Sequence, residues 1–310
     1  MSTPTSLDLA DGVRRTEIRT SRGAFAALEA VPVPGVCERE TALLVPGYTG
    51  SKEDFLALLD QLAAAGRRVL AVDMRGQYQT PGPCPEHKAA DGYSAGALGA
   101  DIAAIARATG TRHLLGHSYG GLVAREAMLD YLTADGIESF TLMSSGPARL
   151  TGPRADELRA MLAALGVSAD EADRPDSTDM PDILPIADVW GAYLEPQAVA
   201  AGVPAVIVDF LRERMLSNDP RGLVQMARHM LSAPDRTDEL ARTVDIPMLV
   251  IYGENDNSWS PAAQEEMAVR LGARRLCIPG AMHSPNVEAP ATTVSALTEF
   301  WDAAEKVSLS

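Results

Sequence analysis

The sequence lacks the features that would place it in a membrane, in a secretory route or around a metal ion. Residues 1–20 contain no apolar stretch of the kind found in signal peptides, and no run approaches the length of a membrane helix. Neither a CxxC pair, a zinc-type cluster nor a dinucleotide glycine motif occurs, and only three cysteines are present, Cys37, Cys84 and Cys277. We therefore expect reduced thiols, a cytoplasmic location, no membrane span, no metal and no cofactor.

Positive charge is also scarce. The chain has 27 lysines and arginines against 42 aspartates and glutamates, which gives a net charge of −15. This balance argues against a general affinity for nucleic acid or anionic membranes. With 46% hydrophobic residues over 310 positions, the composition is that of an ordinary globular protein, built as one large domain or as a domain with an insertion.

Strand-like and helix-like segments alternate near both ends of the chain. Segment 15–32 is expected to form a hairpin, and apolar runs predict strands at 41–47, 67–76, 112–118, 139–146, 246–256 and 274–280. Amphipathic patterns predict the intervening helices at 51–66, 93–110, 119–132, 260–272 and 291–307. This alternation implies right-handed crossovers and an α/β fold with a mostly parallel sheet flanked by helices.

The alternation stops between Gly146 and Pro234. Helical patterns without a convincing strand fill this stretch, at 154–166, 204–218 and 220–234, and an acidic, proline-bearing segment interrupts them at 170–182. We interpret residues 149–234 as a helical cap inserted into a core formed by residues 1–148 and 235–310.

The stretch HLLGHSYGGLVARE, residues 113–126, places a serine between glycines where an apparent strand meets an apparent helix. In parallel α/β sheets, ligands bind beyond the carboxyl ends of the strands, where Ser118 is expected to lie. Gly116 and Gly120 are small enough for a tight turn that exposes the serine hydroxyl. This context predicts Ser118 as a catalytic nucleophile.

A serine nucleophile needs a base, and five histidines are available. His283 stands in a loop directly after a predicted strand, the placement that a base above the carboxyl edge of the sheet requires. His117 adjoins Ser118, so its side chain should point away and pack at the strand end. Exposed or structural places are expected for the other three, His87, His113 and His229. His283 is therefore the predicted base, and activity should be lost as it protonates at low pH.

The base in turn needs a carboxylate that holds its tautomer and stabilises the imidazolium. The segment LVIYGENDNSWSP, residues 249–261, supplies two acids after a predicted strand. We predict Asp256 in this role. Glu254 lies within the turn and is the alternative, either as a solvated loop residue or as the orienting acid.

A tetrahedral intermediate would also need two amide donors for its oxyanion. One is expected to be the backbone N–H of Tyr119, which follows the nucleophile at the start of a helix. The other should come from the loop LLVPGYTG, residues 43–50. Pro46 has no amide hydrogen and Gly47 permits a close approach, so Tyr48 N–H is the predicted second donor.

Together these segments resemble the α/β-hydrolase superfamily of serine hydrolases with a helical cap. The resemblance covers essentially the whole chain except the insertion, and implies the α/β-hydrolase fold. Its motifs are Gly47-Tyr48, GHSYGG at 116–121, Gly253-x-x-Asp256, GAMHSPNVEAP at 280–290 and the Asp-x-Arg-Gly strand end at 73–76. The chain order of Ser118, Asp256 and His283 is also the order of that family.

The resemblance implies a cofactor-independent serine hydrolase that cleaves a carboxylic ester, thioester or lactone of a small molecule through an acyl-enzyme on Ser118. Two alternatives use the same residues, namely acyl transfer to another acceptor and hydrolysis of a carbon–carbon bond. A third is a ligand-binding or receptor-like protein with low turnover, because a fold does not dictate its chemistry.

Apolar residues in the predicted cap recur at helical spacing. Most such residues belong to a protein core, but the insertion separates the predicted nucleophile from the predicted acid and should therefore roof Ser118. We expect part of this set to line an apolar pocket: Ile186, Val189, Trp190, Tyr193, Ile207, Phe210, Leu211 and Met215.

Overall fold

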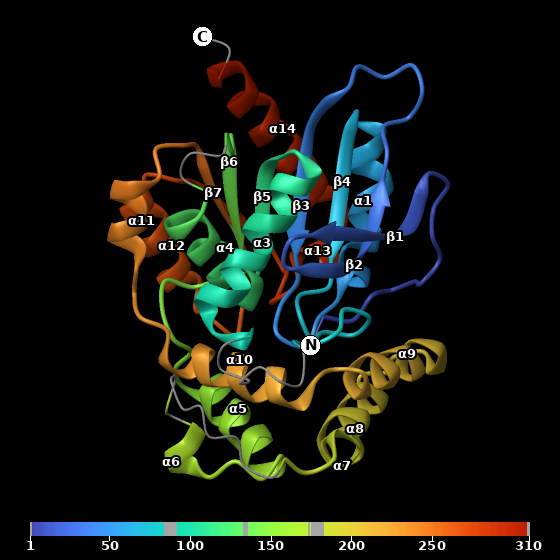
Figure 1. Cartoon of the computed structure of the whole chain (residues 1–310), viewed down its shortest axis with the longest axis vertical. Helices are drawn as coiled ribbons and strands as arrows, with labels where there is room; N and C mark the ends of the chain where they lie inside the picture. Colours follow the sequence, from blue (N-terminus) through green and yellow to red (C-terminus); the bar gives the residue numbers. More distant parts are fainter. Residues whose placement is uncertain (1, 84–91, 133–135, 173, 175–182, 309–310) are drawn as a thin grey trace.

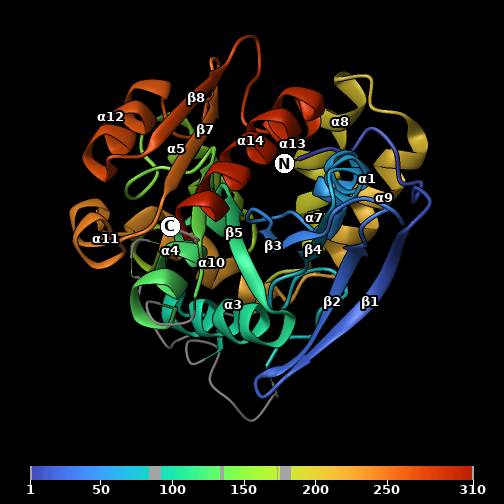
Figure 2. The ribbon, with the colours of Figure 1, turned by 90° about the horizontal axis from the view of Figure 1, so that it is seen from above.

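The computed structural model describes residues 2–83, 92–132, 136–172, 174 and 183–308. An eight-stranded sheet carries helices on both faces, and a further group of helices lies at one end of it (Figures 1 and 2). The expected α/β architecture with a mostly parallel, helix-flanked sheet is therefore confirmed.

The strand order is β1-β2-β4-β3-β5-β6-β7-β8, in which β1 pairs antiparallel with β2, and β2 with β4. The remaining pairs are parallel, so the carboxyl ends of β3 to β8 meet at one edge of the sheet. The strands are β1 (Val13–Thr20), β2 (Gly23–Ala30), β3 (Arg39–Val45), β4 (Arg67–Val72), β5 (Thr111–His117), β6 (Ser139–Met143), β7 (Met248–Gly253) and β8 (Arg274–Ile278).

Alternate residues of the central strands enter two separate cores. Leu43 of β3 packs in the same cluster as Ile102 of α3, whereas its neighbour Leu44 packs in the cluster that contains Leu59 of α1. Successive side chains of a strand point to opposite faces, so a strand buried on both faces must be apolar throughout. This explains the continuous apolar runs in the sequence.

Helices α1 and α14 cover one face of the sheet, and α3, α4, α11 and α12 cover the other (Figure 2). The core helices are η1 (Lys52–Phe55), α1 (Leu56–Ala64), α3 (Ala95–Thr109), α4 (Tyr119–Asp130), α11 (Thr237–Thr243), α12 (Pro261–Leu271), α13 (Pro285–Glu288) and α14 (Pro290–Ser308). No helix in the described ranges is long and apolar enough to cross a membrane.

The segment between β6 and β7 contains no strand among its described residues. Its helices before α11 gather beyond one end of the sheet (Figure 1). They are α5 (Pro153–Ala164), α6 (Ala169–Ala172), α7 (Ile186–Val189), η2 (Trp190–Leu194), α8 (Glu195–Ala200), α9 (Ala205–Leu216) and α10 (Pro220–Ser232). Most of the acidic segment 170–182 lies outside the described residues. The assignment of residues 149–234 as a separate cap domain stays a prediction.

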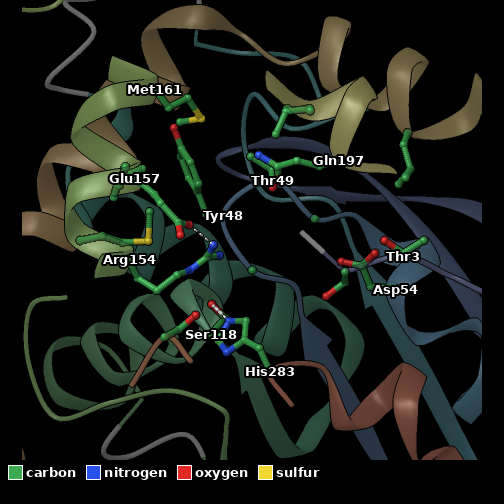
Figure 3. A pocket seen from close by; sticks show the side chains of 18 of the residues that line it. Thr3, Tyr48, Thr49, Asp54, Ser118, Arg154, Glu157, Met161, Gln197 and His283 are labelled. Carbon is green, nitrogen blue, oxygen red and sulfur yellow. Dashed lines mark hydrogen bonds and ion pairs between the residues drawn. The ribbon is translucent and has the colours of Figure 1, made fainter. Parts of the chain in front are cut away.

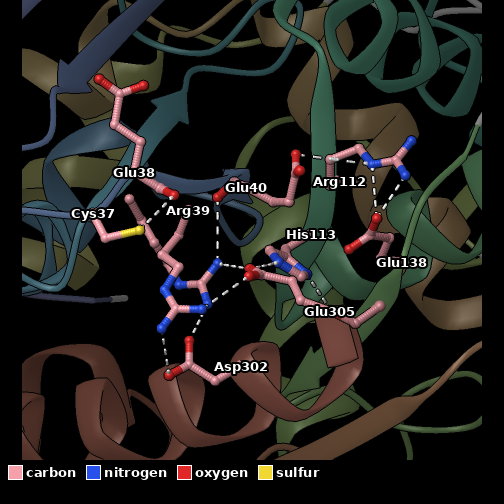
Figure 4. Close-up of polar contacts among 11 residues, drawn as sticks. Cys37, Glu38, Arg39, Glu40, Arg112, His113, Glu138, Asp302 and Glu305 are labelled. Atoms are coloured by element: carbon pink, nitrogen blue, oxygen red, sulfur yellow. Dashed lines mark hydrogen bonds and ion pairs between the residues drawn. The ribbon is translucent and has the colours of Figure 1, made fainter. Parts of the chain in front are cut away.

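A partly buried charge cluster connects α14 to the amino ends of the strands (Figure 4). The fully buried Arg67 of β4 binds Asp302 at 2.5 Å and also pairs with Glu305, both on α14. His113 of β5 bridges the Ser139 hydroxyl at 2.8 Å and Glu305 at 3.0 Å. The cluster lies at the amino end of the strands, opposite the edge at which β3 to β8 end, so we assign it a structural role.

Candidate active site

Ser118 stands between β5 and α4 in a backbone conformation that residues other than glycine rarely adopt. Its backbone has φ 55° and ψ −123°, although it is not glycine. Such strain persists only where the surroundings hold it. Here Ser118 N–H donates to the Met143 carbonyl at 2.8 Å, and Gly121 N–H donates to the Ser118 carbonyl at 2.9 Å.

The flanking glycines are required by close packing around this turn. A Cβ atom at Gly116 would lie 2.4 Å from the Gly120 carbonyl oxygen, and one at Gly120 would lie 2.3 Å from the Pro46 carbonyl oxygen. Both distances are far below a van der Waals contact. The strand, the helix and the loop after β3 can therefore meet at Ser118 only because these positions lack side chains.

The structure brings together the three side chains that the sequence singled out. Ser118 Oγ lies 2.9 Å from His283 Nε2, a contact drawn in Figure 3, and His283 Nδ1 lies 2.9 Å from Asp256 Oδ1. The three residues follow β5, β7 and β8, whose carboxyl ends lie at the same edge of the sheet. This geometry is that of a nucleophile, a base and an orienting acid.

Asp256 is buried and fully hydrogen-bonded. Besides His283, it accepts bonds from the backbone N–H of Ser258 and from the side-chain amide of Gln264, each at 2.9 Å. Burial alone would raise the pKa of Asp256, but the His283 interaction and these donors outweigh it and hold the pKa below its ordinary value. The carboxylate is therefore ionised when it faces the imidazole.

Glu254 occupies a different position. Its carboxylate accepts a bond from the backbone N–H of Gly280 at 2.9 Å and is exposed. This contact closes the turn after β7 against the loop after β8. Of the two acids in this segment, Asp256 is the one that contacts His283.

Two backbone segments border Ser118 where the oxyanion donors were expected. Gly47 lies so close to Ser118 that a Cβ atom on it would be 3.1 Å from the Ser118 Cβ. The peptide N–H of Tyr48 follows directly. Tyr119 begins α4, where the first N–H groups of a helix have no partner within the helix.

Gln77, which sequence reasoning missed, holds the loop after β3. Its buried side-chain amide donates to the Gly47 carbonyl at 2.9 Å and to the Tyr48 carbonyl at 2.7 Å. Its own carbonyl accepts the N–H of Met74 at 3.2 Å. The residue lies 30 positions from Gly47, so no local sequence pattern connects the two.

Three further histidines have lowered pKa values, of which His113 and His117 are buried and His229 is half-buried. Burial is the main cause, and it takes the pKa of His113 to about 4, of His117 to about 3 and of His229 to about 4. His117 is packed at the strand end, as expected, and its neutral ring donates from Nε2 to the His283 carbonyl at 2.8 Å. His87 lies outside the described residues.

These histidines predict a pH-dependent stability. The unfolded chain takes up protons below pH 6.5 that the folded chain refuses until about pH 4, so the free energy of unfolding should fall as the pH decreases through this window. Each site contributes a slope of about 1.4 kcal/mol per pH unit. Urea unfolding at pH 7.5 and pH 5.0 measures the effect.

His113→Gln is the matched variant, because an amide can keep the contacts to Ser139 and Glu305 without titrating. Its stability should depend less steeply on pH than that of the parent chain. Equal stability of the parent at the two pH values, or an unchanged slope in the variant, would contradict the account.

A cavity of about 380 Å³ opens above Ser118, between the sheet edge and the inserted helices (Figure 3). Of the eight apolar residues singled out from the sequence of the insertion, Tyr193 and Leu211 line it, and the other six are buried. Further lining residues come from cap segments whose roles the sequence did not reveal: Leu150, Arg154, Glu157, Leu158, Met161, Leu194, Gln197, Ala198, Ala201, Val203 and Met230.

Residues 42–296 match the sequence model of the alpha/beta hydrolase family. Over 100 residues, the chain is 36% identical to a protein of Variovorax paradoxus (strain S110) that is provisionally named carbamate hydrolase RutD. The aligned segment spans 32% of this chain and 36% of that protein.

Solved structures of the same architecture match nearly the whole chain. A thermophilic esterase from Thermogutta terrifontis has a TM-score of 0.66 and 23% identity, over 94% of this chain and 99% of that one. The enol-lactonase from Burkholderia xenovorans LB400 has a TM-score of 0.65 and 19% identity, over 92% and 99% of the two chains. At these identities the likeness shows a shared fold.

Proposed function

The chain belongs to the alpha/beta hydrolase family, and we propose that it is a serine hydrolase that cleaves an ester-type acyl bond of a small molecule. The observation that carries this proposal is the hydrogen-bonded series Ser118–His283–Asp256 at the floor of a cavity. A serine hydroxyl is a poor nucleophile until an adjacent base can take its proton, and this series supplies that base.

In the first step, Ser118 Oγ attacks the acyl carbon while His283 Nε2 takes the hydroxyl proton. The C–O bond of the leaving group then breaks, and the imidazolium returns the proton to the departing oxygen. Asp256 stabilises the imidazolium through Nδ1 and fixes the tautomer. Water, deprotonated by the same histidine, attacks the acyl-enzyme and releases the acid with Ser118 restored.

The backbone N–H groups of Tyr48 and Tyr119 would stabilise the oxyanion of each tetrahedral intermediate. Both belong to segments that border Ser118, and the donors are fixed by the fold before the substrate arrives. Fixed donors act most strongly where charge develops in a site that excludes water.

Carboxylic esters, thioesters and lactones are the proposed substrates. The names of the similar solved proteins, an esterase and an enol-lactonase, support this class. Carbamates form a further class, because the partial relative is named for them. The two exposed free thiols, Cys37 and Cys277, suit a reducing compartment, and we propose the cytoplasm.

The class is tested by incubating the protein with one p-nitrophenyl ester, one thioester, one lactone and one carbamate, and following release of the acid. Ester hydrolysis well above the rate in buffer is expected. Binding of these compounds without turnover would favour the receptor-like alternative, and faster product formation with an added alcohol would favour acyl transfer.

The cavity predicts a chain-length optimum. Each buried methylene contributes about 0.8 kcal/mol, so kcat/KM should rise about fourfold per carbon from p-nitrophenyl acetate and then fall once the acyl chain outgrows the cavity. Leu158→Ala or Met161→Ala, which enlarges the cavity on the side formed by α5, should move the optimum to longer acyl chains. Val206→Ala, on the exposed side of α9, is the control. A flat profile that none of these variants alters would contradict the specificity role of the cavity.

A further inference from the structure

Two charged residues of α5 point into the proposed acyl-binding cavity. Arg154 and Glu157 are three residues apart and therefore lie on the same face of the helix. Both line the cavity, and Figure 3 shows their side chains projecting from α5 towards Ser118 and His283. One guanidinium nitrogen of Arg154 donates to the Glu157 carboxylate at 2.5 Å.

Arg154 is the one arginine or lysine among the described residues that line this cavity. The other acid in the wall, Asp54, is already held by the fully buried Arg214 at 2.6 Å. His117 is neutral, because burial lowers its pKa to about 3. The Arg154–Glu157 pair is therefore the one ionic element of the described wall that a ligand can rearrange.

The pair is weak enough to exchange for a ligand. The Arg154 side chain is 34% exposed and that of Glu157 is 62% exposed, and exposed pairs of this spacing contribute little to stability. Glu157, the more exposed partner, can turn into solvent. The guanidinium offers five N–H donors in a planar fork that fits a carboxylate bidentately, and only one of them is used by Glu157.

We infer that the substrate carries a carboxylate at a distance from the scissile bond, and that Arg154 binds it in place of Glu157. This inference rests on the proposed hydrolase function. The chain has a net charge of −15, so its overall electrostatic field repels anions. An anionic substrate would therefore need a positive group inside the cavity to attract it, and Arg154 supplies that group. Monoesters of short dicarboxylic acids have the required chemistry.

The test compares p-nitrophenyl hydrogen glutarate with p-nitrophenyl valerate, which have equally long acyl chains but differ in a terminal carboxylate. Arg154→Gln should lower the kcat/KM of the glutarate ester, relative to that of the valerate ester, about 10- to 100-fold, which is the effect of losing a hydrogen bond to a charged group. Glu157→Gln should raise the ratio. Arg159→Gln, on the same helix but outside the cavity wall, should leave the ratio within twofold.

An unchanged ratio in Arg154→Gln, or a lowered ratio in Glu157→Gln, would overturn the inference. Hydrolysis of the valerate ester by the same proteins would still support the proposed function. A parent protein that cleaves neither ester overturns both. Unfolding midpoints of the variants, expected within 2 °C or so of the parent because the pair is exposed, control for folding.

A second and independent observation concerns Gln77. The C=O of Gly47 and the N–H of Tyr48 belong to one planar trans peptide, in which they point in opposite directions. The Gln77 amide donates to this carbonyl and to the next one, at 2.9 and 2.7 Å, and so fixes the rotation of both peptide groups. The geometry points to Gln77 as a positioning residue that aims the Tyr48 N–H at the oxyanion.

Gln77→Met keeps the length of the side chain but removes both N–H donors. It should lower kcat by up to about 100-fold, which approaches the fall in kcat caused by removing one oxyanion donor. KM should change little. A trifluoromethyl ketone, whose adduct with Ser118 carries an oxyanion, should bind more weakly by a factor similar to the loss in kcat.

Thr80→Val is the matched control for the Gln77 variant. It removes a buried hydroxyl of the same loop, which bonds the Asp73 carbonyl at 3.0 Å and touches neither Gly47 nor Tyr48. It should lower the free energy of unfolding without weakening the binding of the trifluoromethyl ketone. Equal effects of the two variants on ketone affinity, or an unaltered ketone affinity in Gln77→Met, would overturn the positioning role.

Discussion

Ser118→Ala is expected to abolish ester hydrolysis and to remove labelling by a fluorophosphonate probe. In the parent protein the probe should label one site per chain, because Ser118 Oγ is the hydroxyl that lies 2.9 Å from the base His283. Alanine lacks the attacking oxygen but preserves the packing, since only one atom is lost. The measurement is stoichiometric labelling followed by peptide mass spectrometry.

Ser258→Ala is the control for that experiment, because Ser258 also lines the cavity, and its hydroxyl forms no hydrogen bond with a histidine in the part of the chain that the structure describes. This variant should retain labelling. A probe adduct on Ser258, or undiminished hydrolysis by Ser118→Ala, would show that the nucleophile has been assigned to the wrong residue.

Asp256→Asn should lower kcat by roughly 10⁴-fold, the loss found when the aspartate of such a triad is neutralised. The amide cannot stabilise the imidazolium and permits the wrong tautomer of His283. The steady-state rate on one p-nitrophenyl ester measures the loss, and the pH of the assay should be held where the parent is fully active.

Glu254→Gln is the matched variant, because it neutralises an acid two residues away that bonds the Gly280 N–H rather than His283. Its kcat should stay within a few-fold of the parent value. If Glu254→Gln loses activity and Asp256→Asn keeps it, the orienting acid is Glu254 and not Asp256.

The sequence was sufficient to predict the elements that place the site. Ser118 could be found because its neighbours Gly116 and Gly120 leave a local signature, and His283 and Asp256 because each lies in the loop after a predicted strand. The carboxyl ends of parallel strands meet at one edge, so residues far apart in the chain could be expected together before any distance was known.

Other features of the site leave no such signature. Gln77 acts through hydrogen bonds to Gly47 and Tyr48, which are distant in sequence, and Gln264 bonds Asp256 from the first turn of the following helix. Glutamine is also common at exposed positions. Arg154 sits in the first turn of α5, where the direction of its side chain depends on how this helix packs over the sheet edge. Short helices such as α11 and α13 are too brief for a periodic pattern.

The pocket lining was the least predictable part for a related reason. Helical spacing identifies the apolar face of a helix but does not distinguish a face that packs on another helix from one that faces a cavity. Trp190 and Phe210 are buried, and the Phe210 ring packs edge-on against Tyr78 of the loop after β4, whereas Tyr193 and Leu211, from the same set, reach the cavity.

Mass spectrometry of the protein, quenched in acid during turnover of a p-nitrophenyl ester, tests directly whether the reaction passes through an acyl group bound to Ser118. We expect one added acyl mass per chain, carried by the peptide that contains Ser118 and lost as the substrate is exhausted. An acyl adduct on another residue, or rapid hydrolysis by a protein that never gains mass at Ser118, would contradict it.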